Sequence, residues 1–198
     1  MSCPMDRRQF LGCSMAGGAL LAANLDARGA LAVVEAGWPQ PAPAKIHAVY
    51  VGRTGGIYLS RPTEEVGRLK EYVNDLAQRL GDVEFVGGEF VPETAAAEVV
   101  KKIADADAVL MIHLSGHGGA APGDDMDQII EANKPTAVFS QPFSGHGWMY
   151  FPQWQKKRKK VVLLPTSDWS ELDRVVGLMR VAPRLRQTKI LVVRGPMG

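Results

Sequence analysis

Short apolar runs alternate with amphipathic segments from Lys45 onward, and this pattern predicts the secondary structure. The apolar runs have the length of β-strands and span residues 46–51, 83–91, 108–114, 136–139, 161–164 and 189–193. Segments 64–80, 93–104, 124–132 and 170–185 repeat apolar residues with helical spacing, and Thr63 is expected to cap the first of them. Apolar strands separated by helices indicate a parallel sheet that is covered on both faces.

The predicted fold is therefore α/β, a three-layer, doubly wound and mostly parallel sheet of flavodoxin- or Rossmann-like type with five or six strands. Sheets of this kind bind ligands at the carboxyl ends of their strands. We expect the functional loops after Val51, Leu114, Phe139 and Leu164.

These loops are rich in glycine and in side chains that form hydrogen bonds. Glycine lets the backbone approach a ligand closely, and Ser, His, Gln and Trp add polar contacts and a stacking surface. The candidate ligand-binding residues are Arg53, Ser115, Gly116, His117, Gly118, Gly119, Ser140, Gln141, Ser144, His146, Trp148 and Asp168. The strongest local signal is Ser-Gly-His-Gly, which occurs at 115–118 and again at 144–147.

Each of these features also has a structural explanation. Glycine-rich turns are common after parallel strands because the chain must reverse there. His47 and His113 lie within predicted strands, where we expect core histidines and not ligands. Residues 52–56 could hold a phosphate or carboxylate, although they match neither a P-loop nor a dinucleotide fingerprint. Asp168 could serve the site or only the surface.

The N-terminus has the features of a twin-arginine export signal. Arg7 and Arg8 precede a weakly apolar stretch at 10–25, and residues 30–32 offer a small-x-small cleavage site. We expect residues 1–32 to be a signal peptide, 33–44 a proline-rich linker and 45–198 the α/β domain. The predicted localisation is periplasmic, with the Tat translocase as partner during export.

Charge and cysteine content exclude several classes of function. The formal net charge is +2 and the one basic run lies at 156–160, which argues against nucleic acid as a partner. Cys3 and Cys13 both lie in the predicted signal, so the domain has no thiol nucleophile, disulfide or cysteine metal ligand.

Residues 112–118, Ile-His-Leu-Ser-Gly-His-Gly, resemble the strand-end Ser-Gly-His-Gly of caspase-like cysteine proteases, where the histidine is the general base. The nucleophile should follow the next strand, but residues 139–142 read Phe-Ser-Gln-Pro without a cysteine. This resemblance implies a degenerate caspase-like or serine hydrolase, with Ser140 or Ser144 in place of the cysteine.

Residues 45–195 also resemble the N-terminal domain of the L-fucose and L-arabinose isomerase-like family. The likeness lies in the order of strands and helices, in the glycine-containing loop after the third strand, and in Lys134-Pro135 before the fourth. It implies an exported sugar isomerase-like protein whose N-terminal lobe shapes a carbohydrate site lined by His117 and His146. The family's divalent metal, for which Mn²⁺ is the expected ion, is held by ligands in a later part of the polypeptide; no metal ligands are assigned within this sequence.

This resemblance implies an aldose-ketose isomerase in full length and an inactive fragment on its own. Residues 194–198 are turn-forming and follow the sixth predicted strand, where a second domain would begin. A non-catalytic periplasmic ligand-binding module and the hydrolase described above stay open as alternatives. The sequence leaves the sugar, any further cofactor and homo-oligomer formation undecided.

Overall fold

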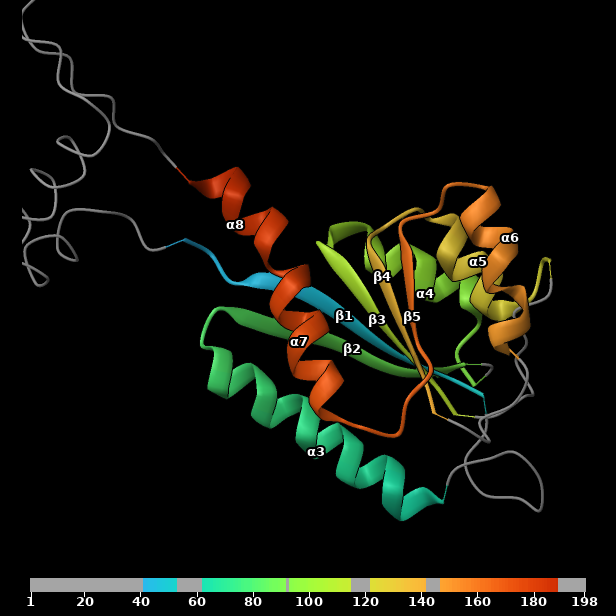
Figure 1. Cartoon of the computed structure of the whole chain (residues 1–198), viewed down its shortest axis with the longest axis horizontal. Coiled ribbons are helices and arrows are strands. Elements are labelled where there is room, and N and C mark those ends of the chain that lie inside the picture. The colour runs from blue at the N-terminus through green and yellow to red at the C-terminus, as the bar shows by residue number, and fades with distance from the viewer. Residues whose placement is uncertain (1–40, 53–61, 92, 115–121, 142–146, 189–198) are drawn as a thin grey trace, which may run out of the picture. The chain divides into compact units, whose positions relative to one another are not determined.

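The computed structural model describes residues 41–52, 62–91, 93–114, 122–141 and 147–188. Within them, five parallel strands form one sheet in the order β2-β1-β3-β4-β5 (Figure 1). The strands are β1 (Ala44–Val51), β2 (Val83–Val91), β3 (Ala108–His113), β4 (Thr136–Ser140) and β5 (Val161–Leu164). This order is that of flavodoxin-like folds, so the predicted fold class is confirmed.

Helices cover both faces of the sheet (Figure 1). They are α3 (Thr63–Leu80), α4 (Ala96–Lys102), α5 (Asp125–Glu131), α6 (Phe151–Lys156), α7 (Ser170–Met179) and α8 (Val181–Gln187), with short 3₁₀ turns η1 (Ile103–Asp105) and η2 (Gly147–Tyr150). Neither η2 nor α6 is predicted from the sequence, because the segment is short and begins beside a glycine-rich stretch. The predicted sixth strand at 189–193 lies outside the described residues.

The core has two layers because successive side chains of a strand point to opposite faces. One layer packs Ile46, Leu110 and Phe139 of the sheet against α3 and α7. The other packs alternate strand residues, among them Met111, against α4, α5 and Trp154 of α6. Every residue of β3 and β4 is buried, which explains why these strands are apolar except at their ends.

Two predicted helices differ from those observed, for reasons of backbone chemistry. Thr63 is not the cap of α3; it is the first helical residue, and Pro62 occupies the cap position without a side-chain hydrogen bond. The helix predicted at 170–185 is broken between Met179 and Val181. Pro183 causes this break, since it has no N–H to donate and its ring clashes with the carbonyl four residues earlier.

The helix predicted at 93–104 is also shorter than expected. It begins at Ala96 and tightens into η1 at Ile103, while Val99 and Ile103 are buried as the spacing predicts. Short 3₁₀ turns of this kind are common at helix ends.

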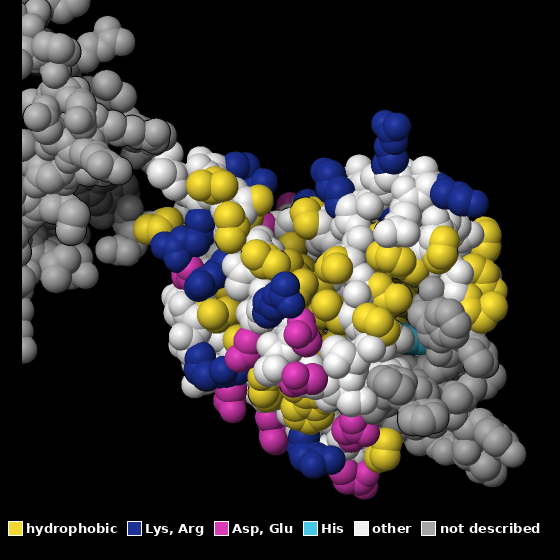
Figure 2. Space-filling view, viewed as in Figure 1, with side chains coloured by type: hydrophobic (Ala, Val, Ile, Leu, Met, Phe, Trp, Pro, Cys, Tyr) yellow, Lys and Arg dark blue, Asp and Glu magenta, His cyan; other side chains and the backbone are white. Residues whose placement is uncertain are grey.

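The described surface mixes charge of both signs with scattered apolar side chains on the face that carries α3 and α7 (Figure 2). Leu178, Val181 and Leu185 are exposed apolar residues of α7 and α8. Two arginines of this segment, Arg180 and Arg184, pair with Asp82 just before β2. Among the described residues, no helix is both long and apolar enough to cross a bilayer.

A β-bulge interrupts the edge strand β2. Its register with β1 shifts between Ala48 and Val49, so Gly88 has no partner there, and Gly87 and Gly88 both have positive φ. A Cβ on Gly87 would lie 2.4 Å from Nε2 of His47, whereas a Cβ on Gly88 would meet nothing within 4 Å. Position 87 therefore needs glycine for two reasons: its φ is positive, and a side chain would collide with His47.

We expect Gly87→Ala to lower the free energy of unfolding by about 3 kcal/mol, because overpacking against His47 adds to backbone strain. Gly88→Ala is the matched control. It introduces backbone strain without a steric clash, so it should lower the free energy of unfolding by only about 1 kcal/mol. Urea unfolding followed by circular dichroism measures both variants. If both variants lost the same free energy of unfolding, the contact between residue 87 and His47 would contribute nothing to stability.

Candidate functional site

A buried polar cluster lies where β3 and β4 end at the carboxyl edge of the sheet. His113 and Ser140 are register partners, and His113 Nδ1 shares a 3.0 Å hydrogen bond with Ser140 Oγ. The exposed fractions of His113, Ser140 and Gln141 are only 1%, 4% and 5%. Polar side chains are costly to enclose without a partner, so their concentration at one edge indicates a specific role.

Strand periodicity explains this placement. His113 follows Met111 by two residues and Ser140 follows Val138 by two, so both polar side chains continue the sheet face that packs against α4, α5 and α6. Each of the two strands thus changes from apolar to polar at its last residue. The last residues of β3 and β4 lie side by side.

The ends of β1, β2 and β3 are tied together at the same edge. The N–H of Gly52 donates to the carbonyl of Val91 at 2.8 Å, and the N–H of Leu114 donates to the carbonyl of Val51 at 2.8 Å. Gly52 has a φ of 112°, a conformation that other residues rarely adopt. β1 lies between β2 and β3, so the topological switch point, where such folds bind ligands, lies beside His113.

The structure describes the surroundings of three predicted site residues, of which two lie at the carboxyl edge and one lies on the surface. Ser140 and Gln141 lie at the carboxyl edge with His113. Asp168 is exposed, and its Oδ1 accepts a 2.9 Å hydrogen bond from the N–H of Ser170, which explains it as a surface residue of the turn before α7. Its pKa lies below the ordinary value because of the hydrogen bonds from Ser170.

The other candidates fall outside what the structure describes. Arg53, residues 115–119, Ser144 and His146 lie outside the described residues, and of Trp148 only the backbone, within η2, is described. Sequence analysis missed His113 as a site residue because it was assigned to the core. The available signal was its position at the end of a strand directly before Ser115-Gly116-His117.

A second polar cluster joins β1, β2 and α4. His47 Nε2 donates to Glu89 Oε2 at 2.8 Å, and Lys102 Nζ donates to Glu89 Oε1 at 2.8 Å. His47 is 2% exposed, and its Nδ1 has no hydrogen-bond partner among the described residues. Burial by itself raises the pKa of Glu89, but hydrogen bonds from Lys102, its own backbone and His47 outweigh it, so this pKa lies below its usual value.

We interpret the Glu89 cluster as structural, since it fixes the bulged edge strand against β1 and α4. Within the described ranges, no three side chains of the metal-binding types His, Cys, Asp and Glu lie together. The carboxyl edge of the sheet is therefore the candidate site, and its described side chains can form hydrogen bonds with a ligand.

Comparison with known proteins identifies a similar architecture only. Neither a protein-family model nor a curated protein sequence matches the chain. Among solved structures, the crystal structure of a diflavin flavoprotein A3 from Nostoc sp. is similar over 74% of this chain and 99% of that chain. The identity is 15% and the TM-score 0.43.

The sugar isomerase-like function predicted from the sequence is wrong. The protein found by structure comparison is a flavoprotein, which points away from a sugar isomerase. The carbohydrate ligand, the Mn²⁺ ion and the assignment to aldose-ketose isomerisation followed from that function alone. The predicted flavodoxin-like architecture is unaffected.

We expect the Glu89 carboxylate to stabilise the fold at neutral pH and to lose this effect in acid. A lowered pKa means that the stabilisation is present above the unfolded value, about 4.3, and disappears as the pH falls through the folded value. Glu89→Gln should therefore cost about 2 kcal/mol at pH 7 and progressively less below about pH 4.

Urea unfolding of the wild type and the variant between pH 7 and pH 3 measures this difference. Glu71→Gln, at an exposed glutamate of α3, is the matched control and should show a small, pH-independent difference. A Glu89→Gln cost that stays constant down to pH 3 would contradict the assigned hydrogen bonds.

Proposed function

We propose that this chain is a small-molecule-binding domain that holds an anionic, phosphorylated ligand at the carboxyl edge of its sheet. The observation that carries this proposal is the buried cluster of His113, Ser140 and Gln141 at the ends of β3 and β4. A ligand at this edge would receive directional polar contacts from a rigid sheet, as small-molecule sites require. The topology supports the same position, because the cluster lies beside the switch point.

The anionic character of the ligand follows from the chain after β1. Gly52 begins the sequence Gly-Arg-Thr-Gly-Gly, which has three glycines, whose peptide N–H groups have no side chain of their own beside them, and an arginine that adds positive charge. Glycine-rich segments after a strand bind phosphate through such N–H groups. The proposal therefore specifies a phosphate group and leaves the rest of the ligand open.

The geometry favours binding over nucleophilic catalysis at Ser140. A serine nucleophile needs a base within hydrogen-bonding distance, and His113 meets this condition. However, Ser140 is only 4% exposed, which suits a hydroxyl that hydrogen-bonds a bound ligand better than one that attacks a substrate. We therefore assign the pair to the wall of a binding site.

We expect at least one of FMN, AMP and inorganic phosphate to bind saturably to the full chain. FMN is included because sheets of this strand order hold it at the switch point. Ser140→Ala should weaken binding about fivefold to tenfold, since it removes one hydrogen-bonding hydroxyl worth about 1 kcal/mol. Isothermal titration calorimetry measures the affinity.

Ser170→Ala provides the matched control, because this serine is exposed at the start of α7; its affinity should equal that of the wild type. Riboflavin and adenosine, which lack the phosphate, should bind more weakly than FMN and AMP. Absence of saturable heat with all three phosphorylated probes, or equal binding of the neutral pair, would refute an anionic ligand.

We further propose that the domain is exported by the Tat pathway, on the basis of Arg7 and Arg8 before a weakly apolar stretch. Replacing both with lysine should leave the protein in the cytoplasm as an uncleaved precursor, because the translocase reads the arginine pair itself. Cell fractionation with immunoblotting measures this. Arg28→Lys is the control and should be exported normally; export of the double-lysine variant would contradict the assignment.

A further inference from the structure

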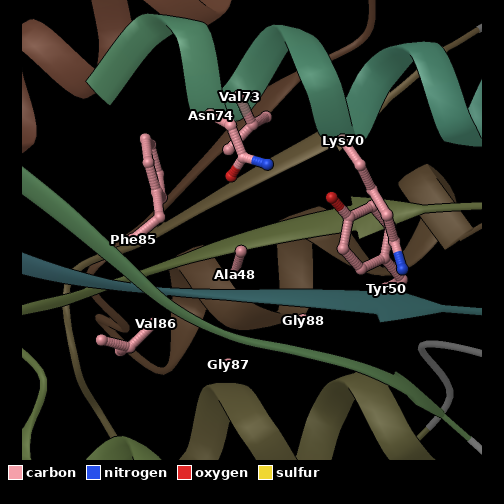
Figure 3. Close-up of a pocket in the computed structure, with 9 residues that line it drawn as sticks. All are labelled: Ala48, Tyr50, Lys70, Val73, Asn74, Phe85, Val86, Gly87 and Gly88. Carbon is pink, nitrogen blue, oxygen red and sulfur yellow. The ribbon is translucent and has the colours of Figure 1, made fainter. Parts of the chain in front are cut away.

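A pocket lies between α3 and the bulged edge strand β2, and it shares no residue with the carboxyl-edge cluster (Figure 3). Its volume is about 240 Å³. Tyr50 and Ala48 of β1, Lys70 and Asn74 of α3, and Phe85 and Gly88 of β2 line it. This volume is below the range of drug-sized sites, so the pocket suits a small organic molecule.

The pocket exists because the bulge removes side chains where α3 passes over the strand. Ala48 is small, and a Cβ at Gly88 would meet no atom within 4 Å. Gly88 is also the residue left without a register partner in β1. β2 therefore presents bare peptide groups between the side chains of Phe85 and Tyr50, which is a common use of glycine in strands.

Three polar groups around this space have no hydrogen bond or ion pair with another described residue. They are the Tyr50 hydroxyl, the Asn74 amide and the Lys70 ammonium. Tyr50 is only 2% exposed, yet its hydroxyl oxygen and the Asn74 amide point toward each other above Ala48 (Figure 3). Polar groups that face a pocket and have no hydrogen bond to a described residue are available to a ligand.

The available groups are hydrogen-bond donors around one positive charge. Burial raises the pKa of Tyr50 well above its ordinary value, so the phenol keeps its proton and can donate. Lys70 Nζ lies 4.1 Å from the ring centre of Phe90 and 4.9 Å from that of Tyr50, and these rings hold the ammonium at the pocket with no carboxylate partner among the described residues.

We propose that this pocket binds a small carboxylic acid with an apolar body. Its carboxylate would accept hydrogen bonds from Lys70, Tyr50 and Asn74, while its apolar part packs on Phe85 and Ala48. A monoanion matches the single lysine, whereas a phosphate dianion would leave one charge uncompensated in a partly buried site. This proposal does not depend on the ligand at the carboxyl edge.

Benzoate is the probe for this site, and benzamide is its neutral counterpart of nearly the same shape. Titration of the ¹⁵N-labelled full chain should shift the amide signals of Gly87 and Gly88 saturably with benzoate and at least tenfold more weakly with benzamide. The factor of ten corresponds to about 1.4 kcal/mol for the charged hydrogen bonds.

Lys70→Met, which keeps the aliphatic stem, should weaken benzoate binding at least tenfold, and Tyr50→Phe severalfold. Lys156→Met, at an exposed lysine of α6, is the matched control and should bind like the wild type. The proposal is overturned if benzoate causes no saturable shift at about 10 mM, if benzamide binds equally, or if Lys70→Met has wild-type affinity. The benzamide comparison uses the unmodified chain, so it stands even where a variant fails to fold.

Discussion

Burial of β3 on both faces is the constraint on which the rest of the structure depends. All six residues of this strand are buried, so helices must cover the sheet on each side. Parallel pairing in turn requires each connection to cross back over a face, which places α3 and α7 on one side and α4, α5 and α6 on the other. Polar side chains can enter this arrangement only at strand ends or at an irregularity, and both kinds of position are occupied here.

The sequence was sufficient for the five described strands and for the fold class, because hydrophobic periodicity reflects burial directly. The boundaries of β1 and β2 agree with their predicted ranges to within two residues. Helix ends were less predictable, because Thr63 is a frequent capping residue but Pro62 takes that position. The effect of Pro183 could have been derived from its missing N–H, since the break lies within one turn of it.

The candidate site was only partly predictable for a different reason. Ser140 and Gln141 could be named as candidates because they follow the apolar run at 136–139, which is a property of the sequence alone. The hydrogen bond between His113 and Ser140 depends on β3 and β4 being neighbours in register. The pocket beside Lys70 depends on a bulge in β2, and two consecutive glycines in a strand do not reveal which face they open.

The basic run at 156–160 also has a position that the sequence did not reveal. It immediately precedes β5, the four-residue strand at one margin of the described sheet, in which Val162 is 43% exposed. Lys157 and Lys159 pair with Glu131, which fixes part of this charge beside the strand. A short apolar strand at the margin of a sheet can pair with a strand of another molecule, and neighbouring lysines are a common defence. The charge of the run is therefore placed where gatekeeper residues hinder edge-to-edge association.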